Sequence, residues 1–561
     1  MDGFIADLVA LLQRKAERTR AHPEERIHLA AYLFAACHAL TQNYPGVEMR
    51  LPFAGYRGSD GDDLTLAYET LLALPSSLGP VDLFLSLLAV LNRIDAQFRP
   101  WTHVRDFDIS TRLEGVLSGL VVFHWISGPS LLRKVRAWTA QLDDSPQEYR
   151  DSIQDALSNL TLYLTATVPF PGRGAAVRSA LHEFMPNHDP ALGSSGALIG
   201  DGAPFRIALC PLPAVWHTRF CILKDRQVTG FTTLRGDAIA NREALASHVE
   251  RVIDEAENLG DVRFLIFPEL TLDDALRQTI VARLARGSSL HLVCAGSFHV
   301  WRDGAARPQN EALIFDGGRR PLWSHCKNGK FDLPARIVRA PGCFPTDPPD
   351  QIPRHALPEL IELGTELRFL DCPLGRIVLV TCADALDRSP GTKPSFHAAI
   401  LALRPDLVVV IAMSPRTGSF EPFFEEMLRH GIGILFVNAA CACEPRRQPA
   451  DAAATAAAGA APAAADAEPA DCLAFVDLGL LEVEGSPASR WRWRAGSEPE
   501  FMRCRKGSWA PLAQHSGDPG VQLLPSGALV VDLQPALAPL LKQMESDERG
   551  GAEPGPALAP V

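Results

Sequence analysis

From residue 206 onward, short apolar runs alternate with segments of helical periodicity. Each run has four to eight residues rich in Val, Ile and Leu, with hardly any polar interruption. A strand that is apolar at nearly every position is buried on both faces, so helices or a second sheet must cover it. This pattern predicts an α/β fold with covered sheets. The runs include RIALC (206–210), VRFLIF (262–267), HLVCAGSF (291–298), EALIF (311–315), RIVLVT (376–381), DLVVVIAM (406–413), GILFVN (433–438), CLAFVDL (472–478) and ALVVDL (528–533).

Residues 1–195 follow a different pattern. Apolar residues recur there every three or four positions, as in IADLVALLQR, ERIHLAAYLFAACHAL, DLFLSLLAVLNRI and RDSIQDALSNLTLYL. This spacing is typical of amphipathic helices, and we predict an all-α N-terminal domain over 1–195 with an interaction or regulatory role. Its histidines occur singly and are interpreted as structural.

Composition shifts mark the other boundaries. A Gly/Ser/Pro-rich segment at 191–205 is typical of a linker, so the α/β domain is predicted over 203–540. Within it, residues 446–470 are rich in Ala and Pro and indicate a flexible surface insert. Residues 541–561 are polar and rich in Pro and Gly, which predicts a disordered tail.

Charge and cysteine content narrow the classes of function. The chain of 561 residues has a formal net charge of -12 and no Lys/Arg stripe with interleaved aromatics, so nucleic acid is not an expected partner. The beginning of the chain lacks a cationic leader, and the apolar stretch 115–128 is short and interrupted by Gly, so we expect a cytoplasmic protein without membrane spans. The twelve cysteines are scattered, and Cys441 and Cys443 lack partners at metal-ligand spacing. We therefore expect reduced thiols and no metal.

Three predicted strand ends carry groups that could perform chemistry. Glu269 follows 262–267, Lys327 and Lys330 follow the stretch PLWSHC, and Cys382 follows 376–381. Binding and catalytic groups of α/β proteins commonly lie at such ends. A cysteine thiol that adds to a carbonyl carbon needs a base, which a glutamate can provide. An ammonium group can stabilise the negative charge that develops on the oxygen. The expected product is a thioester, which water then hydrolyses.

Each of these residues also has a structural interpretation when it is taken alone. A cysteine after a Val/Leu run is typical of a buried core thiol. Glu269 could favour the dipole of the helix that follows it. Lys327 and Lys330 could be solvated residues of a turn at Asn328-Gly329. Only the combination of the three residues distinguishes a site from these alternatives.

The order of the motifs resembles the nitrilase, or carbon–nitrogen hydrolase, superfamily. FPEL, a strand ending in Lys and a strand ending in Cys-x-Asp are similar to the family's Glu-Lys-Cys triad, and similar motifs extend over about residues 205–480. The resemblance implies a four-layer α-β-β-α sandwich, a small-molecule amide or nitrile substrate, and a homo-oligomer without cofactor. It also implies Cys382 as nucleophile, Glu269 as general base and acid, and Lys327 as stabiliser of the tetrahedral intermediate, with an amide favoured over a nitrile.

The sequence departs from the family pattern at several positions. Ala383 stands where the family usually has an aromatic residue, which puts the shape of the substrate pocket in doubt. Lys330 is an alternative to Lys327, because KFDLP resembles the family's other lysine motif. A second, auxiliary glutamate is either Glu359 or Glu362, and we favour Glu362. Ser414 and Asn438 are interpreted as structural or pocket-edge groups.

A second hypothesis belongs to a different class of function. The nitrilase-like part could act as a binding or regulatory module of a multi-protein system, including bacterial antiviral ones, while residues 1–195 dock a protein partner. Such a large N-terminal addition is not needed for hydrolysis and contains no catalytic constellation of its own. This hypothesis rests on analogy between fold families.

Overall fold

The computed structural model describes most of the α/β part and several pieces of the N-terminal part. The described residues are 2–22, parts of 29–40, 64–96, 111–117, 120–127, 132, 163–167, 206–212, 218–225, 228–260, 262–316, 321–329, 331–339, 343–348, 350–364, 369–371, 375–386, 396–403, 405–414, 417–439, 472–477, 490–494, 500–505, 508–511 and 521–533.

Three helices form the first described part of the chain. Their apolar residues at helical spacing, among them Leu12, Leu71 and Leu87, are buried together in one cluster. The side-chain amide of Gln13 donates a hydrogen bond to the carbonyl of Leu72 at 3.1 Å and so links the helix over 2–21 to the helix over 64–72. Helical periodicity therefore predicted these segments. The helices are α1 (Asp2–Ala21), α3 (Leu64–Leu72) and α4 (Pro80–Ala96).

The prediction of an all-α domain over 1–195 is wrong for the segments that follow these helices. Three strands there form an antiparallel sheet in the order β1-β2-β3. The run LVVFHWIS is rich in β-branched and aromatic residues, which favour strands, and only the two residues Ser-Gly separate β1 from β2, as in a tight hairpin. The strands are β1 (Thr111–Leu117), β2 (Leu120–Ser127) and β3 (Tyr163–Thr167).

The first sheet of the α/β part has seven strands in the order β10-β9-β8-β7-β4-β22-β21. β4, β7 and β8 are parallel, whereas β9, β10, β21 and β22 pair antiparallel with their neighbours. Residues of α10 and α11 pack against one face of this sheet in a common buried cluster. The elements are β4 (Arg206–Leu209), α10 (Arg242–Asn258), β7 (Val262–Ile266), α11 (Asp274–Leu284), β8 (Leu292–Val300), β9 (Gln309–Asp316), β10 (Pro321–Cys326), β21 (Val521–Leu523) and β22 (Leu529–Asp532).

The second sheet has eight strands in the order β13 to β20. Its central strands β14, β15 and β16 are parallel and buried at every position. Residues of α13 and α14 join alternate residues of these strands in a second cluster. The elements are β13 (Phe369–Asp371), β14 (Arg376–Thr381), α13 (Phe396–Leu403), β15 (Leu407–Ala412), α14 (Glu421–Arg429), β16 (Gly433–Asn438), β17 (Cys472–Asp477), β18 (Arg490–Arg494), β19 (Glu500–Arg505) and β20 (Ser508–Pro511).

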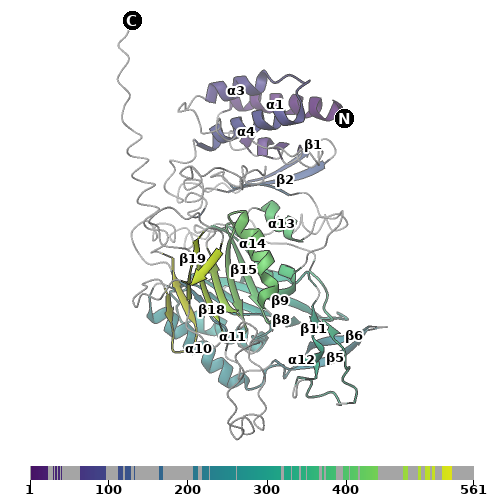
Figure 1. Cartoon of the computed structure of the whole chain (residues 1–561), viewed down its shortest axis with the longest axis vertical. Coiled ribbons are helices and arrows are strands. Elements are labelled where there is room, and N and C mark those ends of the chain that lie inside the picture. Colours follow the sequence, from purple (N-terminus) through teal and green to yellow (C-terminus); the bar gives the residue numbers. More distant parts are fainter. Residues whose placement is uncertain are drawn as a thin grey trace.

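The two sheets lie between two pairs of helices. Figure 1 shows α13 and α14 on one side of the α/β part and α10 and α11 on the other, with β15 and β8 between them. The strand residues that do not face the helices, such as Ile377 and Ile207, are buried as well. The mixed α/β class predicted from the sequence is therefore confirmed, and the carboxyl ends of β7 and β14 are brought close to each other by the facing sheets.

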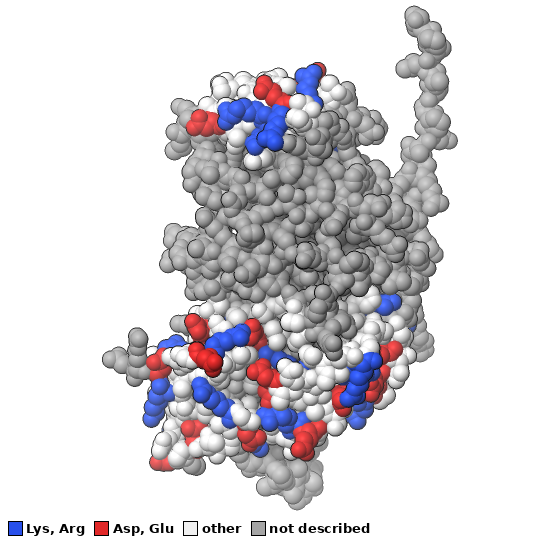
Figure 2. Space-filling view, turned by 180° about the vertical axis from the view of Figure 1, so that it is seen from behind, with Lys and Arg blue, Asp and Glu red and all other residues white. Residues whose placement is uncertain are grey.

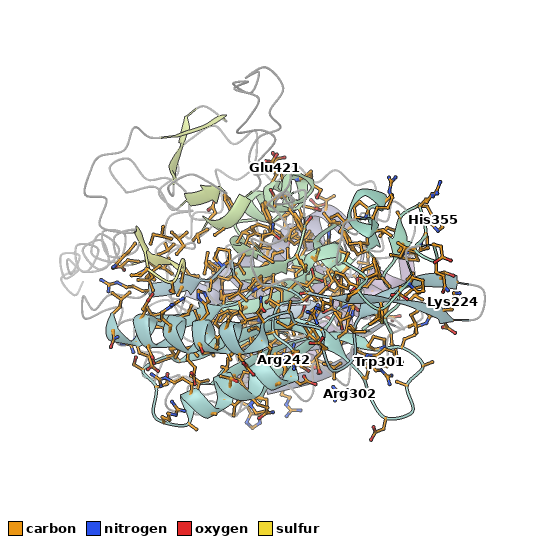
Figure 3. The ribbon with its side chains drawn as sticks, turned by 90° about the horizontal axis from the view of Figure 1, so that it is seen from below. Lys224, Arg242, Trp301, Arg302, His355 and Glu421 are labelled. Carbon is orange, nitrogen blue, oxygen red and sulfur yellow. The ribbon has the colours of Figure 1, made fainter. Side chains whose placement is uncertain are left out.

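A two-stranded hairpin and several short elements complete the α/β part. The hairpin β5–β6 extends from the body, and Figure 3 shows Lys224 near its outer end. A 3-10 helix begins directly at Cys382. These elements are β5 (Phe220–Asp225), β6 (Val228–Thr233), β11 (Asp332–Leu333), α12 (Ala335–Val338), β12 (Leu357–Pro358), η4 (Cys382–Leu386) and η5 (Thr417–Phe420).

Two general properties concern the surface and the helices. Among the described residues, no helix has the length and apolar character needed to cross a bilayer. Figure 2 shows basic and acidic side chains interspersed on the described part of one face of the molecule.

Candidate active site

The structure brings Glu269, Lys327 and Cys382 together from three different strands. Lys327 donates a hydrogen bond from Nζ to Oε1 of Glu269 at 2.8 Å, across 58 positions of sequence. The Cys382 thiol lies close enough to both that the charges of Glu269 and Lys327 act on its pKa in opposite directions. All three side chains are almost completely buried, with at most 2% of each residue exposed. Lys330, the alternative lysine, lies outside the described residues.

Glu269 is positioned by the strand beside it. The backbone N–H of Leu270 donates to the carbonyl of Ser297 at 2.7 Å, and Leu270 has a left-handed φ of 54°. A β-carbon at Gly296 would lie 2.1 Å from the carbonyl oxygen of Pro268, so only glycine allows this approach. Asp273, rather than Glu269, caps the helix α11 through the N–H of Leu276. The alternative interpretation of Glu269 as a helix-dipole residue is therefore not needed.

Cys382 lies at a strained turn where β14 ends and η4 begins. Its φ is 44°, in the left-handed region that non-glycine residues seldom adopt. Such conformations cost on the order of 1–3 kcal/mol and persist where the surrounding contacts determine them. The turn places the thiol beside the charges of Glu269 and Lys327, which both act on its pKa.

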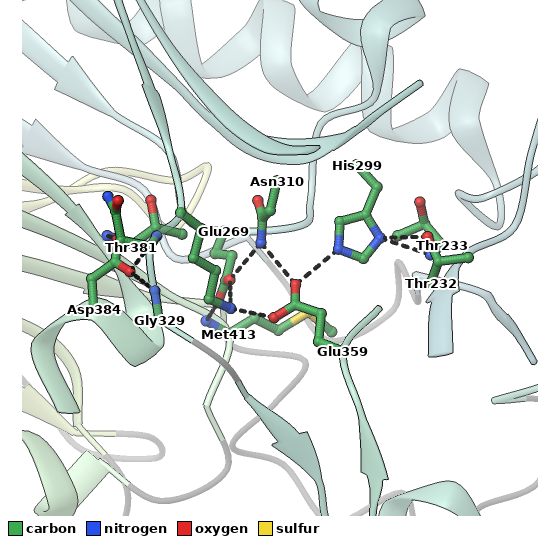
Figure 4. A network of polar contacts seen from close by, with 12 residues as sticks. Thr232, Thr233, Glu269, His299, Asn310, Gly329, Glu359, Thr381, Asp384 and Met413 are labelled. Carbon is green, nitrogen blue, oxygen red and sulfur yellow. Dashed lines mark hydrogen bonds and ion pairs between the residues drawn. The ribbon is translucent and has the colours of Figure 1, made fainter. Parts of the chain in front are cut away.

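Asp384 connects the cysteine turn to the lysine loop. Its Oδ1 accepts hydrogen bonds from the backbone N–H groups of Asn328, at 2.7 Å, and Gly329. Its Oδ2 accepts from His325 Nε2 at 2.8 Å and from the N–H of Thr381 at 3.2 Å. Figure 4 shows the contacts with Gly329 and Thr381 at one end of the polar network. One buried carboxylate thus fixes the cysteine turn and the lysine loop relative to each other.

We expect Gly329→Ala to disturb this register. An added β-carbon would lie 2.7 Å from the backbone carbonyl of Ala383, which cannot move without displacing the cysteine turn. The matched control is Gly418→Ala, where no atom lies within 4 Å of the added carbon. Chemical denaturation should show a loss of about 1–3 kcal/mol for Gly329→Ala only. Equal stability of the two variants would contradict the close approach.

The second glutamate that contacts Lys327 is Glu359, whereas Glu362 was favoured from the sequence. Glu359 Oε2 accepts a hydrogen bond from Lys327 Nζ at 2.7 Å, and its side chain is fully buried. Glu362 is exposed, and only its backbone N–H contacts the neighbouring segment, through the carbonyl of Pro308. The segment 357–364 therefore directs Glu359 inward and Glu362 outward.

Asn310 joins the two carboxylates that flank the ammonium group. Its Nδ2 donates to Oε1 of Glu269 at 2.9 Å and to Oε1 of Glu359 at 3.0 Å. The remaining oxygen of Glu269, Oε2, accepts from the backbone N–H of Met413 at 3.0 Å. Figure 4 shows Asn310 between Glu269 and Glu359, with Met413 beside Glu269. Every carboxylate oxygen of the pair has a donor, as buried charges require.

The charges of this cluster shift the pKa values of its members. Burial alone would lower the pKa of Lys327, but the carboxylates of Glu269 and Glu359 raise it well above its usual value. Burial would raise the pKa of Glu359, yet Lys327 and the hydrogen bonds to it lower that pKa to about 2. Lys327 is therefore a fixed cation between two anions, so it cannot accept the thiol proton.

The Glu359 carboxylate should stabilise the fold above its ordinary pKa and lose this contribution in acid. Because its pKa is lowered from 4.5 to about 2, the contribution disappears as the pH falls through this interval. As the pH falls from 4.5 to about 2, we expect the free energy of unfolding to decrease more steeply for the wild type than for Glu359→Gln. Parallel pH dependence of the two proteins in denaturant titrations would contradict the assignment.

The Cys382 thiol is protonated at neutral pH. Burial raises its pKa well above the usual value, the charge of Glu269 raises it further, and Lys327 and the Met413 N–H act against these effects. We expect no thiolate absorbance step near 240 nm between about pH 5 and 8 in the difference between wild type and Cys382→Ala. An absorbance step in that pH range, assigned to Cys382, would instead show that this cysteine is a thiolate in the free protein.

Ser414 and Asn438 form a local structural pair. The side-chain oxygen of Asn438 accepts from the N–H of Ser414 at 2.8 Å, and its amide donates to the carbonyl of the same residue at 2.9 Å. Both contacts hold the end of β15 beside β16, immediately after Met413. The pair therefore acts through the backbone near the site, in line with the structural interpretation of the two residues.

Within the described part of the chain, no group of His, Cys, Asp and Glu side chains could hold a metal ion. Cys37, Cys210, Cys221, Cys294 and Cys382 are free thiols. Cys441 and Cys443, which lack partners at metal-ligand spacing in the sequence, lie outside the described residues.

Sequence reasoning missed several residues of the site. Asn310 and His299 were not singled out, and Asp384 entered only as the Asp of Cys-x-Asp, without a role. The alternation of side chains along β8 could have indicated His299, because Ser297 and His299 are polar residues at alternate positions of this mostly apolar strand.

Comparisons with known proteins were made for the sequence and for the structure. No family profile matches the sequence, and the search of curated proteins found no match. An amidase from Nesterenkonia AN1 aligns with 15% identity, 62% of this chain, 97% of its own chain and a TM-score of 0.30. Nit3 from Saccharomyces cerevisiae aligns with 10% identity, 61% of this chain, 94% of its own chain and a TM-score of 0.32. These two proteins are members of the nitrilase superfamily.

A glutamine-dependent NAD+ synthetase from Acinetobacter baumannii also matches, with 14% identity and a TM-score of 0.28. That alignment covers 42% of this chain and 38% of the synthetase, so this chain spans well under half of that protein. Superpositions this loose carry no argument about the site of this chain. The layers and contacts described above rest on its own strand order and hydrogen bonds.

Proposed function

We propose that the protein is a nitrilase-superfamily hydrolase that cleaves a non-peptide carbon–nitrogen bond, with an amide as the favoured substrate. One observation carries the proposal: the Glu269 carboxylate contacts the Lys327 ammonium, and the charges of both act on the buried Cys382 thiol beside them. A base, a nucleophile and a fixed cation within one buried cluster are the parts that acyl transfer to sulfur requires.

In the first step, the Cys382 sulfur attacks the carbonyl carbon of the amide. The thiol proton passes to Glu269, a sulfur–carbon bond forms, and the carbonyl π electrons move to the oxygen. The Lys327 ammonium stabilises this oxyanion. The intermediate collapses when the carbon–nitrogen bond breaks, and the leaving nitrogen takes the proton from Glu269. The product of this step is a thioester on Cys382 together with ammonia or an amine.

In the second step, water hydrolyses the thioester. Glu269, again a carboxylate, takes a proton from the water while its oxygen adds to the thioester carbon. Collapse of the second intermediate releases the carboxylic acid, and the proton returns to the Cys382 sulfur. Glu359 contacts Lys327, so we assign it to holding the ammonium group in place.

The proposal is tested with the full-length protein and a panel of short aliphatic and aromatic primary amides, with the corresponding nitriles beside them. We expect ammonia release and a transient acyl adduct in intact mass spectra of the wild type, with greater turnover of amides. Cys382→Ala should show neither. Cys221→Ala, which removes a half-buried thiol of β5, is the matched control and should behave like wild type.

The proposal fails if the wild type releases no ammonia and forms no adduct with any member of the panel. It fails equally if Cys382→Ala retains wild-type turnover. Acid production from nitriles alone would keep the nucleophile and change the substrate class.

A further inference from the structure

His299 lies beside the proposed site, and its contacts determine which ring nitrogen carries the proton. The backbone N–H of Thr233 points to Nδ1 at 2.8 Å, and a backbone N–H can only donate. Nδ1 is therefore an acceptor without a proton. The proton of the neutral ring is on Nε2, which donates to Oε1 of Glu359 at 2.9 Å. Figure 4 shows this chain of contacts from Thr233 through His299 to Glu359.

The β5–β6 hairpin thus contacts Glu359 by two routes. Through the backbone, the N–H of Leu360 donates to the carbonyl of Phe231 at 2.9 Å. A β-carbon at Gly230 would lie 2.3 Å from the carbonyl oxygen of Pro358, so the hairpin packs directly on the segment that carries Glu359. Through the His299 side chain, the Thr232 hydroxyl and the Thr233 backbone N–H hold the ring, and the ring holds the carboxylate.

Glu359 in turn determines where the ammonium group lies. Lys327 Nζ contacts Glu359 at 2.7 Å and Glu269 at 2.8 Å, so the two carboxylates compete for it. The N–H of His299 satisfies part of the negative charge on Glu359. Without that donor, Glu359 would attract Lys327 more strongly, away from the thiol and from the oxyanion that forms beside it.

We propose that His299 is a positioning residue of the site, because its Nε2–H holds Glu359 and thereby sets the position of Lys327 relative to Cys382. The inference rests on the proposed function for its effect on turnover. It also makes a claim that needs no turnover, namely that the reactivity of the Cys382 thiol depends on the donor at Nε2. The hairpin supplies the acceptor contact that keeps the proton on that nitrogen.

Two substitutions separate the two ring contacts. His299→Gln places an amide donor near the position of Nε2 and loses the acceptor for Thr233. His299→Asn keeps an acceptor near the position of Nδ1 and loses the donor to Glu359. The control is His291→Gln, the same substitution at the other end of β8, where the ring contacts Arg263 instead.

Three quantities are measured for each full-length variant: kcat and KM for an amide turned over by the wild type, the alkylation rate of Cys382 by iodoacetamide from peptide mass spectra, and the thermal midpoint. We expect His299→Asn to lower kcat and the alkylation rate about 10- to 100-fold with little change in KM. His299→Gln should retain most of both rates, and His291→Gln should match wild type.

Equal rates for His299→Gln and His299→Asn, or rates that follow only the thermal midpoints, would overturn the inference and leave the proposed hydrolysis intact. Conversely, absence of amide turnover in wild type would overturn the hydrolase, while the order of the alkylation rates would still decide the role of His299. If the variants do not fold, 15N-histidine NMR spectra of the wild type near pH 7 show which ring nitrogen of His299 carries the proton. A buried ring protonated at Nε2 alone supports the inference, and a ring protonated at Nδ1 overturns it.

Discussion

Lys327→Met is expected to lower the free energy of unfolding by about 3–5 kcal/mol, the largest effect on stability among the changes considered. The substitution has nearly the same length but leaves the carboxylates of Glu269 and Glu359 buried together without their shared cation. Two like charges in a site that excludes water repel each other, and neither retains a counter-ion among its described contacts. The variant should also lose hydrolysis, because the oxyanion would have no ammonium beside it.

Chemical denaturation of the full-length protein measures this effect, with Lys224→Met as the matched surface control. Lys224 is exposed on β5, so its replacement should change stability by less than about 0.5 kcal/mol. Adding Glu359→Gln to Lys327→Met removes one of the unpaired charges and should restore part of the loss. A Lys327→Met protein as stable as the Lys224→Met control would mean that the buried pair is not charged as described.

Glu269→Gln should reduce the rate of acylation by about 100- to 10,000-fold, the range that general acid–base groups usually contribute. The amide has nearly the same shape as the carboxylate, so it can still accept a hydrogen bond from Lys327, but it cannot take the proton of a thiol whose pKa is raised. Single-turnover measurements of thioester formation by mass spectrometry separate this step from the hydrolysis that follows.

The matched control is Glu362→Gln, because it makes the same substitution at the exposed glutamate of the segment 357–364. Wild-type acylation is expected there. Acylation that survives in Glu269→Gln but fails in Glu362→Gln would contradict the assignment of Glu269 as the base.

The three strand-end residues could be predicted because local patterns mark where buried strands stop. Glu269, Lys327 and Cys382 each follow such a strand, although β10 is antiparallel to β9 and β14 belongs to the other sheet, so the meeting of their ends did not follow from one parallel sheet. The helix α10 was predictable for a similar reason, since its apolar periodicity is clear over many residues.

The choice between Glu359 and Glu362 could not be made from local sequence. The segment 357–364 has no regular period that assigns an inward face, and its orientation depends on the hairpin β5–β6, more than a hundred residues earlier. The close approach of Gly230 to Pro358 decides which glutamate is buried. Similarly, the partners of Asp384 come from a loop of the other sheet, so its role depends on how two sheets meet.

The strands β1 and β2 were missed for a different reason. Their residues repeat apolar side chains so densely that helical and strand spacing are both satisfied. In such runs the β-branched and aromatic composition is the better indicator, and LVVFHWIS contains five such residues among eight.

The pairing of β22 with β4 has a consequence for folding during synthesis of the chain. β4 begins at Arg206, and the strand that covers its second edge ends only at Asp532, after more than three hundred further residues. While a ribosome synthesises the chain, β4 can pair with β7 early, but its other edge stays open until nearly the whole α/β part has emerged. An open strand edge invites pairing with other chains. The first sheet is therefore completed last. A nascent or truncated chain that ends before β22 would expose the unpaired edge of β4, next to β7, the strand that leads to Glu269.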